Sequence, residues 1–446
     1  MKSIARLSLL ALAVLSYTAG AREIVVPDDV STIRVALNQA RIGDVVRLRP
    51  GTYTESSLNL VAGVTIRGDV NAPERHVIDA GRAGRVVRAE GVADCRLEGL
   101  TIVGGHANGP SSYSGSGGGL FISRSSAILH RVRFVGNTAD ASGGGLRVAY
   151  SDVDLVDCEF VDCSAAKGGG AVDLSYESTV NIAGTRFLGN GAAWGGAISV
   201  RSNSSCFVEN SVFRQNSTAP PQELGGAFFA DHAARVTFTH CVLANNSARQ
   251  GGAARLADAV SGFANCTIDG NQASEGGAGL MVRGGTLVLD HSIVSFNQGD
   301  AVTVQDGEAF IMATDVYGNS LGDWRGDIAH LRDINDNLSL DPEYCDEGVY
   351  ELAASSPCAE ENSPVGRIGA LGVGCENVGI TVHEFGVDSS GRGLVLSWTL
   401  LDHRGWQFRL VGRSLADPSA PEWVVPHVSR GHDGRFEAHD DPASEL

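Results

Sequence analysis

Carboxylates are the side chains in this sequence with the clearest potential for catalysis. A pair of carboxylates can protonate a leaving oxygen and activate a water molecule, which is the chemistry of glycoside hydrolysis. The two Asp-Asp pairs, Asp28-Asp29 and Asp440-Asp441, lie outside the regular middle of the sequence. We therefore do not assign them this role, and the catalytic residues, if the chain has any, are unknown from the sequence.

Other carboxylates fall on predicted strands and would form an acidic stripe if they shared one face. They are Asp152, Asp154, Asp173 and Glu177. We interpret them as solvated surface groups, because charged side chains are rarely buried without a partner. Asp290-His291 joins an acid and a base, but His291 aligns with His240 and Asn210 of neighbouring repeats, which favours an outward, solvated position.

Metal-ligand patterns are missing from the sequence. The 12 His residues show no His-x-x-x-His spacing, so no metal site and no cofactor are predicted. The formal net charge of -18 makes nucleic acids and acidic membranes unfavourable partners. An acidic polysaccharide would need a cation such as Ca²⁺ to mediate its binding.

The elements that would position any site follow from a repeat of about 26 residues, which predicts stacked, similar units. A glycine pair begins each unit, at Gly118, Gly144, Gly169, Gly195, Gly225, Gly251 and Gly276. A bulky apolar residue follows, at Phe134, Phe160, Phe187, Phe213, Leu243, Ile268 and Val294. Three positions further lie Asn137, Cys163, Asn190, Asn216, Asn246, Asn271 and Asn297. One longer unit carries residues 219–223, which we interpret as a loop insertion.

Alternating polar and apolar residues in each unit, for example over 179–187, predict short strands and leave no room for a long helix. Three strands and three turns per unit describe one rung of a parallel β-solenoid. The Phe column should then stack inside, and the Asn column should lie at one corner, in a left-handed turn conformation, with hydrogen bonds between rungs. A second interior column of small residues should contain free, buried thiols: Cys158, Thr185, Ser211, Cys241, Cys266 and Ser292.

This pattern resembles the right-handed parallel β-helix, or pectin-lyase-like, superfamily over roughly residues 24–375. More narrowly, Gly-Gly-Ala-Ile at 195–198 with Phe-Arg-Gln-Asn at 213–216 is similar to the repeats of the chlamydial polymorphic outer-membrane proteins. The superfamily includes polysaccharide lyases, hydrolases and esterases as well as adhesins. None of the hydrolase signatures is present, and Asp290-His291 is only distantly similar to a pectate-lyase segment.

The two ends of the solenoid are expected to be closed. Ile33, Ala36, Leu37 and Ala40 follow Ser31-Thr32 with helical spacing, which predicts a short helix across the first rung. The segment from 341 to 375 resembles the closing segment of secreted bacterial β-helix proteins. We predict a disulfide between Cys345 and Cys358 and leave the partner of Cys375 open.

The N-terminus predicts export. Lys2 and Arg6 precede an apolar run at 7–15, and an Ala-Gly-Ala site places signal cleavage after Ala21. The predicted domains are therefore a signal peptide at 1–21, a right-handed parallel β-helix at 22–377 and a further module at 378–446. Strand-like runs in 378–446, with Trp398, Trp406 and Trp423, resemble a fibronectin-III-like β-sandwich. This module should be incomplete, because about 100 residues are typical of such a sandwich.

Two functions fit these observations. The first is a secreted or cell-surface protein, without catalysis, that binds a neutral glycan or a protein along a strand face flanked by the 219–223 insertion and by the irregular loop at 104–117. The alternative is a polysaccharide lyase or glycoside hydrolase with a diverged site. Regular rungs without a catalytic signature favour the binding protein, and no membrane span is predicted.

Overall fold

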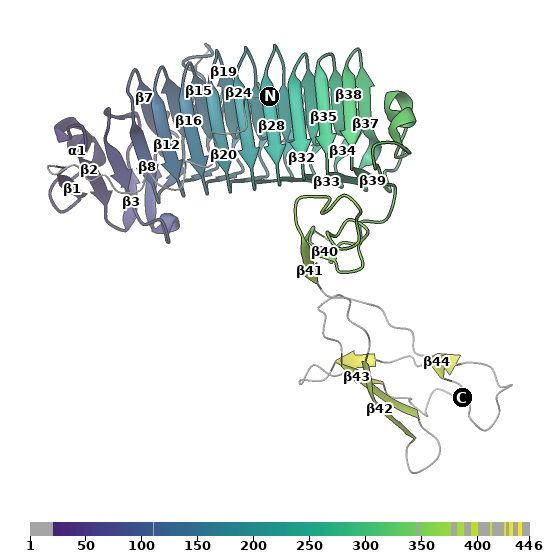
Figure 1. Cartoon of the computed structure of the whole chain (residues 1–446). Coiled ribbons are helices and arrows are strands. Elements are labelled where there is room, and N and C mark those ends of the chain that lie inside the picture. Colours follow the sequence, from purple (N-terminus) through teal and green to yellow (C-terminus); the bar gives the residue numbers. More distant parts are fainter. Residues whose placement is uncertain are drawn as a thin grey trace.

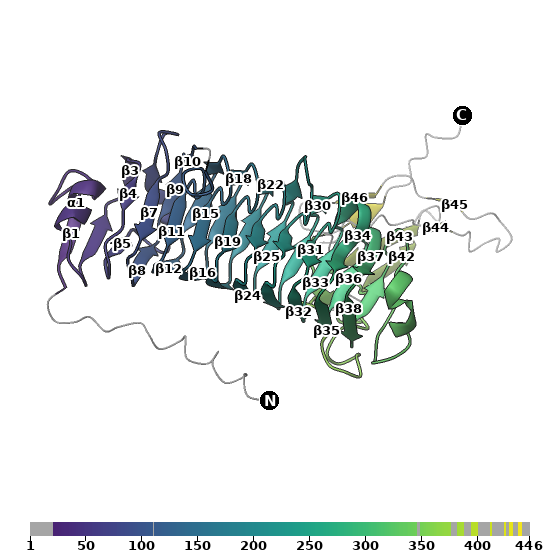
Figure 2. The same ribbon diagram turned by 90° about the horizontal axis from the view of Figure 1, so that it is seen from above.

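The computed structural model describes residues 21–109, 111–345 and 348–375, and beyond them only the backbone of short strands. Three parallel sheets wind around one core and form a right-handed β-solenoid (Figures 1 and 2). The predicted signal peptide lies outside the described residues, except for its last residue, Ala21. No helix within the described part is long and apolar enough to cross a membrane.

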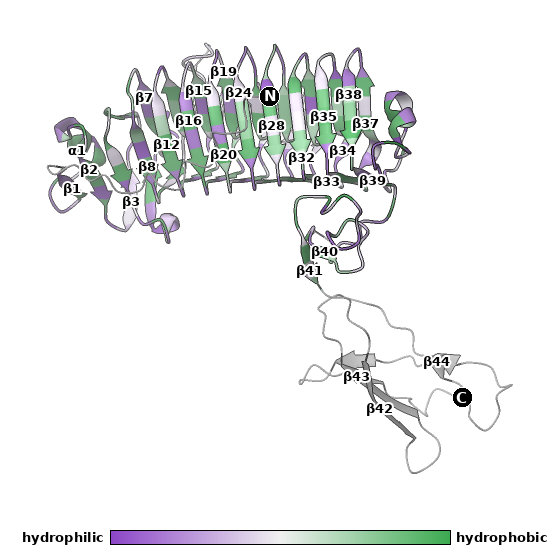
Figure 3. Cartoon of the chain, viewed as in Figure 1, coloured by the Kyte–Doolittle hydropathy of each residue, from purple (hydrophilic) through white to green (hydrophobic). Residues whose placement is uncertain are grey.

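Sheet A has 12 strands that pair in sequence order, one from each rung. They are β1 (Glu23–Val26), β2 (Val45–Leu48), β5 (Thr65–Arg67), β8 (Cys95–Glu98), β12 (Ser126–His130), β16 (Asp152–Val156), β20 (Thr179–Ala183), β24 (Ser205–Glu209), β28 (Arg235–Thr239), β32 (Val260–Ala264), β35 (Thr286–Asp290) and β38 (Glu308–Met312). Buried and more exposed residues alternate along these strands, and Figure 3 shows both hydrophobic and hydrophilic residues on them.

Sheet B has 11 strands that follow those of sheet A around each rung. They are β3 (Gly51–Thr54), β6 (His76–Asp79), β9 (Thr101–Val103), β13 (Arg133–Val135), β17 (Glu159–Val161), β21 (Arg186–Leu188), β25 (Val212–Arg214), β29 (Val242–Ala244), β33 (Thr267–Asp269), β36 (Ile293–Ser295) and β39 (Asp315–Tyr317).

Sheet C completes each rung with two rows of strands. The short row contains β10 (His106–Ala107), β14 (Thr138–Ala139), β18 (Ser164–Ala165), β22 (Gly191–Ala192), β26 (Ser217–Thr218) and β30 (Ser247–Ala248). The long row contains β4 (Leu58–Asn59), β7 (Val87–Glu90), β11 (Leu120–Ser123), β15 (Leu146–Ala149), β19 (Val172–Ser175), β23 (Ile198–Val200), β27 (Phe228–Ala230) and β31 (Ala254–Ala257). The rows meet at β34 (Gln272–Arg283), which also pairs with β37 (Gln298–Gln305).

The predicted interior Phe column is confirmed. Phe134, Phe160, Phe187 and Phe213 are fully buried, and neighbouring rings stack with centroid distances of 4.7, 5.2 and 4.5 Å. The parallel register places each ring directly above the next. The small-residue column is also buried, and Cys158, Cys241 and Cys266 are free thiols as predicted.

The Asn ladder is confirmed, with one correction. Each amide from Asn190 onward donates to the Asn oxygen of the next rung, at 2.9 Å for both Asn190–Asn216 and Asn216–Asn246, and the ladder extends to Asn319. The left-handed residue, however, is the one before each Asn, for example Gly189 or Gln215. The Asn itself turns inward, where it also binds a backbone carbonyl such as that of Phe187.

Helix α1 (Ile33–Gln39) begins at Thr32, whose side chain accepts a hydrogen bond from the Val35 amide, and it buries Ile33, Ala36 and Leu37 among the first strands. Two short 3₁₀ helices follow later, η2 (Pro73–Arg75) and η3 (Gly326–Leu331). Ile328 and Leu331 of η3 pack into the core behind the last rungs.

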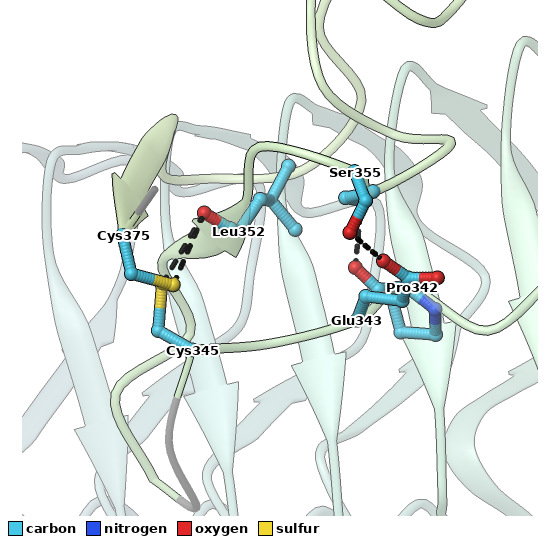
Figure 4. Close-up of a disulfide and its surroundings, with 7 residues drawn as sticks. Pro342, Glu343, Cys345, Leu352, Ser355 and Cys375 are labelled. Atoms are coloured by element: carbon cyan, nitrogen blue, oxygen red, sulfur yellow. Dashed lines mark hydrogen bonds between the residues drawn. A yellow bond between two sulfur atoms is a disulfide. The ribbon is translucent and has the colours of Figure 1, made fainter. Parts of the chain in front are cut away.

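The disulfide prediction was wrong. Cys345 is bonded to Cys375 (Figure 4), and Cys358 is a free, buried thiol. The strands β40 (Leu352–Ala353) and β41 (Val373–Cys375) pair with each other and bring Cys375 to Cys345. Cys358 instead turns toward sheet B and packs on Ile293.

Beyond residue 380 only backbone is described. β42 (Thr381–Val387) pairs antiparallel with β43 (Leu394–Thr399), and β47 (Phe436–Ala438) pairs with both β43 and β46 (Val428–Arg430). β44 (Val411–Gly412) pairs with β45 (Trp423–Val424). The remainder of the predicted sandwich at 378–446 lies outside the described residues.

Candidate functional site

The outward positions of the long row differ from the rest of the solenoid surface because several of them are buried. One such residue per rung follows the parallel register: Phe121, Arg147, Asp173, Ser199, Phe229 and Arg255. We call these residues, with the neighbouring Tyr150, Tyr176, Trp194 and Arg201, the aromatic–arginine strip. Adjacent rungs bring their side chains about 4.8 Å apart.

A tight glycine turn precedes the central strand of the strip. Gly169 has a φ of +61°, and a Cβ added there would lie 2.2 Å from the Val172 oxygen and 2.9 Å from the Asp173 nitrogen. No other residue fits this turn, which leads directly into β19. Asp173 is 0% exposed and Arg147 only 4% exposed, although both point away from the hydrophobic core.

The buried charges form a group of three. Asp173 makes ion pairs with Arg147 and with Arg201, whose Nη2 lies 3.1 Å from the Asp173 Oδ1. Arg147 also donates to the Ser175 hydroxyl. Burial and the nearby Arg201 lower the pKa of Arg147 to about 10, so the guanidinium is still charged at neutral pH. Two cations against one anion leave the group with a positive charge.

Aromatic side chains lie next to these charges. Tyr150 and Tyr176 stack with a centroid distance of 5.0 Å, and they are 50% and 42% exposed. The Arg201 guanidinium lies 5.4 Å from the Trp194 ring centroid, and that of Arg147 lies 5.7 Å from Tyr176. Such cation–π contacts hold the arginines in place while a face of each tyrosine remains open to solvent.

Three polar groups at the centre of the strip lack a hydrogen-bond partner among the described residues. They are the Ser199 hydroxyl, the Trp194 indole N–H and the Arg201 Nε–H. Ser199 is 0% exposed. Buried polar groups are normally hydrogen-bonded, so three unpaired ones in a small area distinguish this part of the strip. Protein atoms cover all three, and the Trp194 indole N–H lies against Gly168. A ligand would therefore first meet the exposed parts of Arg201, Tyr150 and Tyr176.

Both segments that the sequence placed beside a binding face border this strip. The 104–117 loop precedes β11, and its Tyr113 packs edge-on against Phe121 and hydrogen-bonds to Glu90 at 2.6 Å. The exposed 219–223 insertion precedes β27, which carries Phe229. Phe121 and Phe229 are four rungs apart in the register, or about 19 Å at the spacing of parallel strands.

The four carboxylates considered as an acidic stripe do not share one face. Asp152 and Asp154 lie on the outer face of sheet A, where Asp154 accepts a hydrogen bond from Asn181, and Glu177 lies exposed in a turn. Asp173 is buried in sheet C, so its interpretation as a solvated group was wrong. This burial could not be predicted from the sequence, because Arg147 and Arg201, which pair with Asp173, come from the two neighbouring rungs.

His291 is not simply solvated either. Its Nδ1 lies 2.7 Å from Asp290 Oδ1, and its Nε2 lies 3.1 Å from the Val365 carbonyl. This pair therefore holds the C-terminal segment against sheet B. Among the described residues, no cluster of His, Cys, Asp or Glu could hold a metal ion.

A shallow pocket of about 210 Å³ on sheet B is a weaker candidate. Its charged lining residues are paired with one another: Arg133 contacts Glu159 at 2.7 Å and Arg131 contacts Asp157 at 3.5 Å, while Arg186 shares Glu159 at 3.7 Å. Among the described residues that line this pocket, no buried polar side-chain atom lacks a hydrogen-bond partner, in contrast to the Ser199 hydroxyl.

The stacked sheets define a right-handed parallel β-helix fold with a polar, aromatic strip on its outer face. Residues 86–273 match the family model described as right handed beta helix region. Among solved structures, the chain is similar to pectate lyase Pel9A, with 12% identity, a TM-score of 0.44, and coverage of 79% of this chain and 96% of that one. It is also similar to the PL6 family alginate lyase AlyGC, with 12% identity, a TM-score of 0.38, and coverage of 72% and 54%. No curated protein sequence matches the chain.

Proposed function

We propose that this chain is an exported, non-catalytic β-helix protein, secreted or held at the cell surface, that binds a glycan along the aromatic–arginine strip. The observation that carries this proposal is the partly exposed Arg201 guanidinium next to the stacked, partly exposed Tyr150 and Tyr176. The exposed parts of the two tyrosines offer apolar surface to sugar rings.

The expected glycan carries an acidic group. The whole chain is strongly negative, which favours a neutral ligand, but the strip itself is locally positive because Arg147 and Arg201 share the single carboxylate of Asp173. A carboxylate or sulfate group can accept from the part of the Arg201 guanidinium that remains exposed. Binding should then weaken as salt concentration rises.

Calorimetric titration with acidic and neutral polysaccharides would test this proposal. Trp194→Ala and Arg201→Gln should each weaken binding of an acidic polysaccharide at least about tenfold, as for removal of a buried charged or aromatic anchor. Phe207→Ala and Arg235→Gln are matched controls on the outer face of sheet A and should bind normally. Equal losses in the controls, or no binding of any polysaccharide, would contradict the proposal.

Polysaccharide cleavage by elimination is the second candidate, and one observation favours it. Burial and the nearby Arg201 lower the pKa of Arg147 to about 10, so the neutral fraction of this buried guanidinium, which grows as the pH rises toward 10, would be available to take a proton from a bound sugar. Unsaturated products from an acidic polysaccharide, absent in Arg147→Gln but present in the sheet A controls, would replace the binding proposal with this one.

A further inference from the structure

After β39 the chain leaves the solenoid and folds back along the outer face of sheet B, away from the aromatic–arginine strip (Figure 1). We call residues 338–375 the strap. The Ala370 amide donates to the Thr267 hydroxyl at 3.1 Å, and the Gly369 amide donates to the His291 carbonyl at 2.8 Å. The Asn265 amide donates to the Arg367 carbonyl at 3.1 Å.

The strap covers the apolar part of sheet B. Val242, Ala244 and Ile293 point outward from β29 and β36, yet they are buried against Tyr350, Leu352, Ile368 and Ala370 of the strap. In earlier rungs the same sheet presents Arg133, Glu159 and Arg186 to solvent. Sheet B is therefore apolar on its outside where the strap lies.

Two carboxylates lie beneath the strap. Asp269 accepts a hydrogen bond from Ser295 at 2.7 Å, and the Ser295 hydroxyl also lies 2.8 Å from that of Tyr344. Arg214 and Tyr350 face Asp269 as well, and Arg214 stacks on the Tyr350 ring at 5.6 Å. Burial raises the pKa of Asp269 to about 6, although its hydrogen bonds and the positive charge of Arg214 lower that pKa.

Asp315 is 0% exposed under the other end of the strap. Its carboxylate accepts from the Leu340 amide at 2.9 Å and lies 3.6 Å from the Cys358 sulfur. The charged groups around it, Asp323 and Asp341, are both acidic, and Tyr344 also faces it. Burial therefore raises the pKa of Asp315 to about 7, with the neighbouring acids acting in the same direction.

We propose that the strap is a pH-sensitive clasp, closed on sheet B while Asp269 and Asp315 are protonated and loosened when they ionise. A carboxylate exposed by opening has a pKa near 4, so between about pH 4 and pH 7 the closed form holds protons that the open form has lost. Closure is therefore strongest at acidic pH and weakens as pH rises through this range. The Cys345–Cys375 bond keeps the strap a closed loop in both states. Opening would expose the apolar outer face of β29 and β36.

The buried thiol of Cys358 reports on closure. The full chain is alkylated with iodoacetamide at pH 5 and pH 8, each rate is divided by that of the unfolded protein at the same pH, and the modified positions are mapped by mass spectrometry. Protection of Cys358 should fall about tenfold or more between pH 5 and pH 8, because two raised carboxyl pKa values contribute. Cys158, inside the solenoid, should remain protected at both pH values.

The double variant Asp269→Asn with Asp315→Asn cannot ionise at these positions, so its Cys358 protection should be the same at both pH values. Asp333→Asn is the matched control, since this side chain is 90% exposed, and it should retain the wild-type pH dependence. The proposal is overturned if wild-type Cys358 protection does not change with pH, if the double variant changes as the wild type does, or if Cys158 loses protection in parallel.

Discussion

The interior of the solenoid and the strip on its outer face are built in opposite ways. Inside, one residue type is repeated from rung to rung, as in the stacked Phe rings and the bonded Asn amides. On the strip, the register passes from Arg147 to Asp173 to Ser199 without repeating a side chain. The repeated inward residues thus define the fold. The candidate site lies where outward residues are buried but no side chain is repeated from rung to rung.

The largest expected effect concerns the interior. Phe187→Ala should lower the free energy of unfolding by about 3–5 kcal/mol, because it leaves a cavity between two stacked rings. Chemical denaturation measures this loss, and strip binding should be unchanged under conditions where the variant remains folded. A loss of unfolding free energy below about 1 kcal/mol would show that the stacked rings contribute little to stability.

The substitution Asp173→Asn tests a property that the strip shares with the interior, because it removes a charge that is buried although it lies on the outer face. We expect a loss of about 3 kcal/mol, since Arg147 and Arg201 would keep their charges without a carboxylate. Asp152→Asn, on the solvated face of sheet A, is the control and should change stability by less than about 0.5 kcal/mol. Similar values for both variants would mean that the strip is open to water.

Asn190→Ala should cost about 1–2 kcal/mol. It removes the bonds to Asn216 and to the Phe160 carbonyl and leaves the Cys163 amide without its acceptor. Asn190→Cys copies the natural residue at Cys163 and tests whether a thiol can replace the amide. If both variants are as stable as the wild type, hydrogen bonds between rungs do not hold this corner.

The smallest effect on stability is expected at Tyr150, which is half exposed. Tyr150→Ala should change unfolding free energy by less than about 0.5 kcal/mol, since surface substitutions rarely do more. Binding of an acidic glycan should nevertheless weaken several-fold in the same titration that tests Trp194. A variant that loses stability but not binding would remove Tyr150 from the proposed site.

The repeated interior could be predicted from the sequence because its signal recurs once per rung. The inward positions could be recognised because equivalent positions in neighbouring units carry the same type of residue, as in the columns from Phe134 to Phe213 and from Asn190 to Asn297. The left-handed residue before each Asn was missed because its identity varies, as Gly189 and Gln215 illustrate. The repeat is visible in the sequence at the inward Asn, whereas the left-handed φ belongs to the residue before it.

The strip and the strap could not be predicted in the same way. Asp173 becomes buried through Arg147, Arg201 and the turn at Gly169, which belong to three rungs and share no pattern. The pairing of Cys345 with Cys375 depends on how β40 and β41 meet, and cysteine connectivity does not follow from spacing alone.

The Asn ladder also has a mechanical consequence. The solenoid axis runs along the direction of the hydrogen bonds between rungs, so a force that pulls its two ends apart loads the successive interfaces in series (Figure 1). In such an arrangement the weakest interface gives way first. At Cys163 a thiol stands where the neighbouring rungs carry an amide; it donates to the Phe134 carbonyl at 3.5 Å and interacts with the Asn137 side chain. Hydrogen bonds of a thiol are weaker than the 2.9 Å amide bonds of the other rungs. Under tension we expect the molecule to part between β13 and β17 and to yield there one rung at a time.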